Sequence, residues 1–243
     1  MLTIITFTLL PFLSGAIFLF LLFKLENSKF KVSGVAPSYI SSLALTFGLF
    51  ASLTATDVWR RIDQENNYLV AEANSLRTIR RFADIFAENP EIKNELRGHL
   101  TNYINNEQRL LTATRNTGEI YTASSQPLTE MFNLVAENKI TANARINEKI
   151  LDELITLRKS RFQRLETAKS HLNIFKLLGI VIFGMLTQIA IGLGHAGNFR
   201  AQVASVLLFS AAFSAIMGLL TIFENNSVFS YLIIFTPFFD VMM

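Results

Sequence analysis

The sequence predicts an all-α, polytopic membrane protein with four transmembrane helices in two hairpins and a helical cytoplasmic bundle inserted between the hairpins. Composition is the first indication, since 51% of the 243 residues are hydrophobic and only 17% are charged, against about 25% charged in an ordinary soluble domain. Charge is absent from four runs, namely residues 2–23, 32–56, 177–199 and 201–223. In contrast, residues 60–170 carry 17 Lys or Arg and 15 Asp or Glu residues.

Each uncharged run is long enough to cross a bilayer as a helix. Residues 2–23 would span about 33 Å, and a hydrocarbon core is roughly 30 Å thick. The expected spanning helices are Leu2–Phe23, Ala36–Val58, Leu172–His195 and Ala201–Phe223. The expected domains are a first transmembrane hairpin at 1–59, a cytoplasmic helical bundle at 60–170, a second transmembrane hairpin at 171–224 and an interfacial C-terminal tail at 225–243.

Basic residues at both ends of the polar segment set the orientation. The segment begins with Arg60 and Arg61 and ends with a basic cluster, namely Arg158, Lys159, Arg161, Arg164 and Lys169. Because Lys and Arg close to spanning helices favour the cytoplasm, we expect the bundle and both termini to be cytoplasmic. The first apolar run lacks a basic start and a small-residue cleavage site, so we expect it to remain as a helix.

The polar segment is expected to form three amphipathic helical pieces that pack as a bundle. Its apolar residues recur every three or four positions, which is typical of helices that pack along one face. Breaks are expected at Asn89-Pro90 and in the loop from Asn116 to Pro127, and the third piece is expected to continue from Leu128 to Ala168.

No sequence motif indicates an enzyme, a metal site or a cofactor. The chain has no cysteine and three histidines, which are not spaced as metal-ligand pairs. Glu95 and His99 share a helix face, which is more often an exposed pair than a metal site. The sequence contains no glycine-rich phosphate loop or nucleophile elbow. The net charge of +3 is too small to indicate a nucleic-acid partner.

Two charged residues occupy apolar positions of the bundle. Glu107 falls on the apolar face of the second piece, and Arg161 on that of the third. Because buried charges are costly unless paired, we expect Glu107, or Glu72 on the first piece, to pair with Arg158 or Arg161 and lock the bundle. The alternative is a boundary position whose long side chain reaches water.

Arg77, Arg80 and Arg81 cluster beyond the cytoplasmic end of the second span. In an oligomer built around that span they would ring a vestibule and concentrate anions. The alternative is a solvated face, partly neutralised by Asp84 at helical spacing from Arg80 and Arg81.

Small and hydroxyl residues form a stripe along the second span, with phenylalanine beside it. The candidate pore-lining residues are Ser41, Phe47, Gly48, Ser52 and Thr56. The alternative is a close helix contact, because small residues let helix backbones approach each other in lipid. In the third span, Gln188 shares a face with Gly184 and Gly192, and an amide in lipid needs a hydrogen-bond partner. We therefore expect Gln188 to bond to a neighbouring helix.

Two stretches of the chain resemble the bestrophin-like family of prokaryotic membrane proteins. The stretch VAEANSLRTIRRFADIFAENPEIKNELRGHLTNYINNEQRLL looks like the Glu-Ala element of the family, its arginine-bearing helix and its Tyr-x-x-x-Glu element at Tyr103 and Glu107. The stretch RKSRFQRLETAKSHLNIFKLLG looks like the arginine-rich segment before the third span. The chain departs from the family at Gln108, where tryptophan is common, and at Glu224–Phe229, which replaces a Pro-Phe-x-Gly element.

The resemblance implies a homo-oligomeric, pentameric channel for small inorganic anions in the bacterial inner membrane, with the second span nearest to the pore axis. It implies no catalytic residue and no cofactor. The alternative is a non-conducting membrane scaffold or sensor whose cytoplasmic bundle binds a partner. The two functions differ in the expected assembly, because a ring favours a channel and a closed dimer favours a scaffold.

Overall fold

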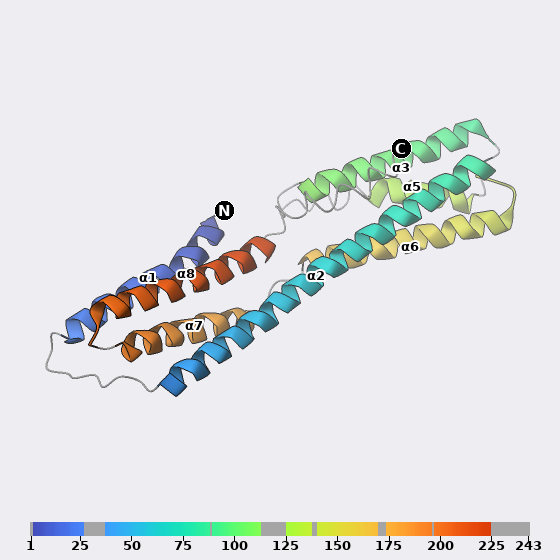
Figure 1. The fold of residues 1–243 in the computed structure, drawn as a ribbon. Helices are drawn as coiled ribbons and strands as arrows, with labels where there is room; N and C mark the ends of the chain where they lie inside the picture. The colour runs from blue at the N-terminus through green and yellow to red at the C-terminus, as the bar shows by residue number, and fades with distance from the viewer. Residues whose placement is uncertain are drawn as a thin grey trace. The chain divides into compact units, whose positions relative to one another are not determined.

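The computed structural model describes residues 2–26, 37–87, 89–112, 125–137, 140–169, 174–195 and 197–224. Over these residues the chain forms seven helices and no strand (Figure 1), so the all-α class is confirmed. The helices group into two compact units, which we describe separately. The described residues of Met1–Arg60 and His171–Asn225 form the apolar unit, and those of Arg61–Ser170 form the polar unit.

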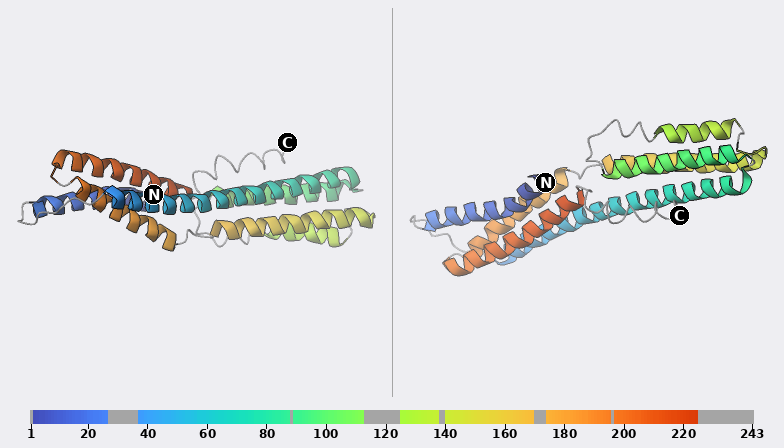
Figure 2. Two further views of the ribbon diagram at one scale, coloured as in Figure 1. Left: turned by 60° about the horizontal axis from the view of Figure 1, so that its bottom comes forward. Right: turned by 90° about the horizontal axis from the view of Figure 1, so that it is seen from above.

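The apolar unit contains α1 (Leu2–Glu26), the first part of α2 (Pro37–Phe86), α7 (Ile174–Gly194) and α8 (Phe199–Glu224). Within the described chain, α2, α7 and α8 contain segments long and apolar enough to cross a membrane. Helix α1 has 25 residues, and its stretch Thr8–Leu21 is also apolar. Helix α1 packs along α8 and also contacts α7 (Figure 2).

A hydrogen-bond node centred on Gln188 connects α1, α7 and α8. The Gln188 amide donates to the carbonyl oxygen of Pro11 at 2.9 Å and to the Ser210 Oγ at 2.8 Å. The Ser14 hydroxyl donates to Gln188 Oε1 at 2.7 Å. Gln188 is 1% exposed, and all of its strong hydrogen-bonding groups are used. The expected interhelical hydrogen bond is therefore confirmed, and it accounts for an amide within an apolar helix.

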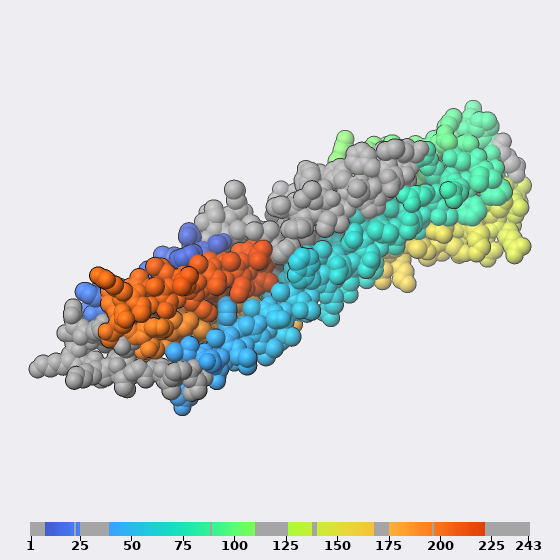
Figure 3. Space-filling model, in the orientation of Figure 1, coloured from blue at the N-terminus to red at the C-terminus, as the bar shows by residue number. Residues whose placement is uncertain are grey.

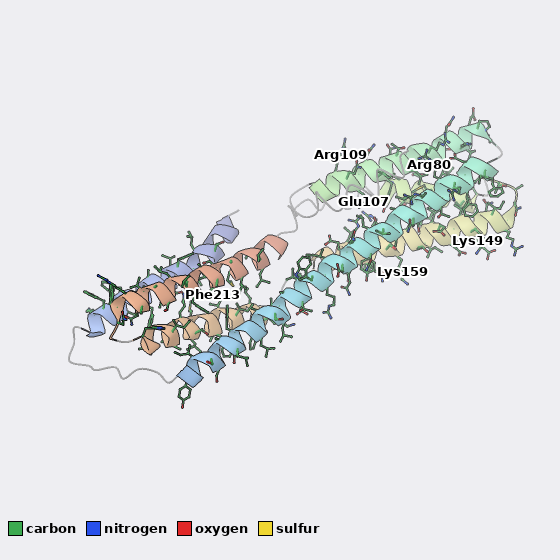
Figure 4. The ribbon with its side chains drawn as sticks, viewed as in Figure 1. Arg80, Glu107, Arg109, Lys149, Lys159 and Phe213 are labelled. Carbon is green, nitrogen blue, oxygen red and sulfur yellow. The ribbon has the colours of Figure 1, made fainter. Side chains whose placement is uncertain are left out.

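Aromatic side chains hold α2 against α7 and α8. The fully buried ring of Phe213 on α8 (labelled in Figure 4) lies 5.2 Å from that of Phe47 on α2, nearly perpendicular to it. The Phe47 ring also lies 5.4 Å from that of Phe209, and Phe50 stacks on Phe183 of α7 at 5.1 Å. These offset and edge-to-face arrangements are favourable for aromatic pairs, so α2 is fixed through its phenylalanine-bearing face.

The polar unit contains the remainder of α2, together with α3 (Pro90–Thr112), α5 (Ser125–Ala136) and α6 (Ala144–Lys169). The break between α2 and α3 falls at Asn89-Pro90, as predicted. The Asn89 side chain accepts a hydrogen bond from the Glu91 backbone N–H at 2.8 Å, and Pro90 occupies the first helical position, where its missing N–H costs nothing.

The prediction of one continuous helical piece from Leu128 to Ala168 is wrong, because this stretch forms two helices, α5 and α6. Asn143 starts α6, since its Oδ1 accepts a hydrogen bond from the Arg145 backbone N–H at 3.1 Å. Asn147 stabilises the turn by donating to the Thr141 carbonyl at 2.7 Å. The sequence concealed this break because Ala142 seemed to continue the apolar pattern through the turn, whereas the structure leaves Ala142 exposed and buries Ile140.

One hydrophobic core fills the polar unit, and each of its four described helices contributes one apolar face. This arrangement confirms the apolar faces expected from the helical spacing. The core residues are Leu69, Ala73, Leu76, Ile79, Ala83, Leu96, Leu100, Tyr103, Ile104, Leu128, Met131, Leu134, Val135, Ile140, Ile150, Leu154 and Leu157.

Replacing Gly184 by alanine should destabilise the apolar unit. A Cβ atom at this position would lie 2.5 Å from two ring atoms of Phe213, and Phe47 packs against that ring. We expect a loss of about 1–3 kcal/mol from overpacking, measured as a lower thermal midpoint of the detergent-solubilised protein. Gly48→Ala is the matched control, because a Cβ there meets nothing within 4 Å. Equal losses in the two variants would contradict the explanation.

Candidate functional site

A buried charge cluster connects α2, α3 and α6 of the polar unit. Arg164 of α6 is 1% exposed. Its Nε donates to Glu72 Oε1 at 2.9 Å and its Nη2 donates to Glu72 Oε2 at 3.2 Å. The same Nη2 donates to Glu107 Oε2. One guanidinium therefore binds two carboxylates from two different helices.

Arg161 supplies the second positive charge of the cluster. Its Nε donates to Glu107 Oε1 at 2.7 Å, and Glu107 (labelled in Figure 4) is fully buried. The cluster therefore contains two carboxylates and two guanidiniums, which balance formally. This balance matters, because an unpaired charge in a protein interior is strongly destabilising.

Tyr103 lies next to this cluster, one turn before Glu107 on α3. It is fully buried, and its hydroxyl has no hydrogen-bond partner within the part of the chain that the structure describes. Burial, followed by the negative charges of Glu72 and Glu107, raises the pKa of Tyr103 well above its usual value. The phenol therefore stays protonated at physiological pH and keeps a hydrogen available to donate.

The two carboxylates of the cluster differ in how easily they ionise. Burial raises the pKa of Glu72 to about 7, and the Arg164 charge offsets this only in part. Burial also opposes the ionisation of Glu107, but Arg164 and Arg161 together outweigh it and hold the Glu107 pKa below its usual value. Burial lowers the pKa of Arg164, but Glu72 and Glu107 reverse this and raise it. Glu72 is thus the group of the cluster that titrates near neutral pH.

The structure brings together three of the four residues expected to form ion pairs, namely Glu72, Glu107 and Arg161, whereas Arg158 is exposed on α6. The expected set omitted Arg164, which pairs with both carboxylates. A signal was present, since Arg164 follows Leu157 by seven residues and Arg161 by three. This spacing places Arg164 on the buried face of α6.

The polar stripe of α2 faces outward from the apolar unit, where part of the α2 surface is visible in Figure 3. Ser41, Gly48, Ser52 and Thr56 are exposed. The Thr56 hydroxyl donates to the Ser52 carbonyl at 2.9 Å. Phe47 is only 5% exposed and lies about 140° around the helix from Ser52, because five residues make about 1.4 turns. Four of the five candidate pore-lining residues therefore share an open face.

The three vestibule candidates lie further along α2. Arg77 and Arg81 are exposed, whereas Arg80, labelled in Figure 4, is half-buried and lies 3.9 Å from Asp84. The nearer partner of Asp84 is Arg97 of α3, at 2.6 Å. Asp84 therefore joins α2 to α3 as well as partly neutralising Arg80.

The described residues include no group of three or more His, Asp or Glu side chains placed to hold a metal ion.

Comparison with known families gives a match to the Bestrophin-like domain over residues 6–230. The chain belongs to the bestrophin-like family. No curated protein matches this bestrophin-like chain in sequence.

Solved structures share the fold of this bestrophin-like protein. Two single-site mutants of a bacterial bestrophin homologue from Klebsiella pneumoniae match with TM-scores of 0.72 and 0.73 at 14% and 13% identity. The matches cover 99% and 98% of this chain and 98% and 97% of the homologue chains. A crystal structure described as that of a membrane protein matches with a TM-score of 0.73 at 13% identity, covering 100% of this chain and 98% of that one.

The sequence elements that resemble the bestrophin-like family meet in the charge cluster. Glu72 comes from the Glu-Ala element, Tyr103 and Glu107 come from the Tyr-x-x-x-Glu element, and Arg161 and Arg164 come from the arginine-rich segment. These elements are far apart in the chain, but their buried side chains form one electrostatic network. The resemblance therefore corresponds to a physical contact between three helices.

Replacing Arg164 by glutamine should strongly destabilise the polar unit. The change leaves Glu72 without its guanidinium partner and Glu107 with only Arg161. Breaking a buried pair in this way costs about 3–5 kcal/mol, measured as a lower thermal midpoint. Arg158→Gln is the matched control, because Arg158 is exposed on the same helix. Adding Glu72→Gln should restore part of the loss, and no restoration would count against the shared-guanidinium account.

Lowering the pH from about 7 towards 4.5 should stabilise the polar unit through Glu72. The pKa of Glu72 is about 7 in the folded chain against 4.5 ordinarily, so the folded state binds more protons in this window. The free energy of unfolding therefore falls as the pH rises through it. Glu107 has the opposite sign, because its lowered pKa gives a contribution that is lost only as the pH falls below 4.5.

The measurement is the thermal midpoint of the purified protein against pH, compared with that of Glu72→Gln. Groups other than Glu72 contribute to both curves, so their difference isolates this carboxyl. The wild type should gain stability relative to the variant as the pH falls through the window. A difference that does not change with pH would contradict the assigned titration.

Proposed function

We propose that this bestrophin-like protein is a homo-oligomeric, anion-permeable ion channel with α2 nearest to the pore axis. The outward polar stripe of α2 carries the proposal. Exposed positions of α7 are large and apolar, such as Leu178, Ile182 and Leu186, as expected of a surface in lipid. Exposed positions of α2 also include large apolar residues such as Leu49 and Leu53, but the exposed hydroxyls of Ser52 and Thr56 among them suit a water-filled path.

The chemistry of the stripe fits passive conduction. The stripe supplies the hydroxyl dipoles of Ser41, Ser52 and Thr56. Gly48 adds no side chain to the pore wall. Selection among ions would therefore depend on the width of the pore and on the dipoles of its wall. We place Arg77 and Arg81, with the partly neutralised Arg80, at the cytoplasmic vestibule. There their positive charge would raise the local concentration of small inorganic anions.

The proposed topology has four spanning helices, in which α1, with 25 residues, joins α2, α7 and α8. A helix of that length extends about 37 Å, enough to cross the hydrocarbon core. We propose that residues 60–170 form a cytoplasmic bundle, that both termini are cytoplasmic, and that the protein resides in the bacterial inner membrane as a pentamer. The expected interfacial tail at 225–243 lies outside the described residues.

The second candidate function is a non-conducting membrane scaffold or sensor. It is favoured by the exposed apolar residues Ile155 and Phe162 on α6, because exposed apolar surface is typical of a place where a partner binds. This function requires the polar unit but no conducting path through the apolar unit.

Chloride efflux from liposomes containing the purified protein tests the proposal. We expect Ser52→Trp to reduce efflux by about tenfold or more, because a large ring on the α2 stripe would obstruct a narrow pore. Leu208→Trp is the control, since Leu208 is exposed on α8 and a tryptophan there would remain outside the pore. Particle size should be measured for each sample.

A ring-sized particle whose efflux is lost only in Ser52→Trp supports the channel. A closed dimer without efflux, in protein that keeps its thermal midpoint, contradicts the channel and supports the scaffold or sensor. Efflux that Ser52→Trp leaves unchanged would contradict the assignment of α2 as the pore wall.

A further inference from the structure

A groove of about 530 Å³ lies between α5 and α6 of the polar unit. Its apolar lining comes from both helices, with Leu128 and Phe132 on α5 and Ile155, Phe162 and Leu165 on α6. Ile155 is 51% exposed and Phe162 is 62% exposed, so the apolar core of this unit does not cover them. The groove is therefore an apolar surface open to a ligand.

The polar part of the lining is strongly basic. Arg158, Lys159 and Arg161 line the groove, and none of the described lining residues is acidic. Arg158 and Lys159 also have no acidic residue three or four positions away on α6. By contrast, Lys149 on the same helix lies 3.9 Å from Asp152. Arg161 is already paired with Glu107, so the groove combines uncovered apolar surface with the positive charges of Arg158 and Lys159.

We propose that this groove binds an amphipathic anion, namely an acyl chain or an apolar body of similar size that carries a carboxylate or a phosphate. The apolar part would lie against Phe132 and Phe162, and the anionic head would bind Arg158 and Lys159. Guanidinium and ammonium groups form strong charge-assisted hydrogen bonds with both kinds of head. Apolar contact along the groove would supply the remaining affinity.

The size of the groove favours a small ligand over a partner helix. Small-molecule sites usually have volumes of about 300–1,000 Å³, and this groove falls within that range. A three-turn helix, taken as a cylinder about 10 Å wide and 16 Å long, occupies about 1,200 Å³. The groove can hold an acyl chain along its length, whereas it could only touch a helix along one side.

Arg161 belongs to the groove and to the charge cluster at once, because it lines the groove and donates to Glu107. A bound anion would therefore lie close to a cation that Glu107 already uses. Substituting Arg161 would disturb both sites, so the test uses Arg158 and Lys159, which are exposed. The binding site does not depend on ion conduction, and either proposal can fail without the other.

Binding of dansyl-undecanoate, a fluorescent acyl carboxylate, tests the proposal on the full chain in phosphatidylcholine nanodiscs. We expect saturable fluorescence enhancement above that of empty nanodiscs, and about tenfold weaker binding in the Arg158→Gln/Lys159→Gln double variant. The matched control is Arg145→Gln/Lys149→Gln, which removes the same charge from exposed positions of α6 outside the groove. The uncharged methyl ester of the probe should bind wild type about tenfold more weakly than the acid.

Nanodiscs that contain phosphatidylglycerol distinguish two sources of the ligand. Weaker binding of the acid there, with binding of the uncharged methyl ester also weakened, would indicate competition from the anionic lipid. Unchanged binding of the acid would indicate that a free acyl carboxylate is preferred, and each result supports the proposed class. Equal loss in the two double variants, or the absence of saturable binding, would overturn the proposal. The Phe162→Cys variant gives a further test. If its chains form disulfides with one another efficiently and the protein does not bind the probe, a second copy of the chain occupies the groove and the proposal is overturned.

Discussion

The Arg164 guanidinium is the interaction on which the polar unit depends. It is a single buried cation that satisfies carboxylates from α2 and α3 while belonging to α6. Apolar residues of similar volume could replace such a network with little loss of stability, so its value lies in specificity. Sliding or rotating any of the three helices would separate a buried charge from its partner, and only one register keeps Glu72, Glu107 and Arg164 together. The electrostatic contact therefore favours the register of α2, α3 and α6 that the structure shows.

The apolar unit fixes its register with uncharged groups. Gln188 uses its full amide to join α1, α7 and α8, and the Ser214 hydroxyl donates to the Thr8 carbonyl at 2.7 Å. Neutral amides and hydroxyls are cheaper to hold in an apolar environment than ions. The two units thus fix the alignment of their helices with different polar chemistry, ions in the polar unit and neutral groups in the apolar unit.

The sequence revealed polar residues that interrupt apolar patterns more readily than it revealed their partners. Gln188 and Glu107 were visible because each occupies a position where an apolar residue is expected. Arg164 was missed because its neighbour Leu165 also continued the apolar pattern. Its spacing from Leu157 was the available signal, and the structure shows that Arg164 is the more deeply buried of the two. Periodicity likewise could not reveal the break before α6, since Ala142 seemed to continue the apolar pattern through the turn. Spacing along α2 places Phe47 away from the stripe, but it does not reveal that its partners are the phenylalanines of α8.

The packing of α1 along α8 imposes an order on assembly during synthesis. Helix α1 is made before the other described helices, yet its main partner is the last helix that the structure describes, so the contact between them has a very large sequence separation. All the helices of the polar unit leave the ribosome before α8 does, and that unit can form its core first. Before α8 is made, Ser14 of α1 can already bond to Gln188 of α7, but the partner of Gln188 on α8, Ser210, is still missing. Among the described helices, the apolar unit is therefore completed after the polar unit, when α8 packs onto α1.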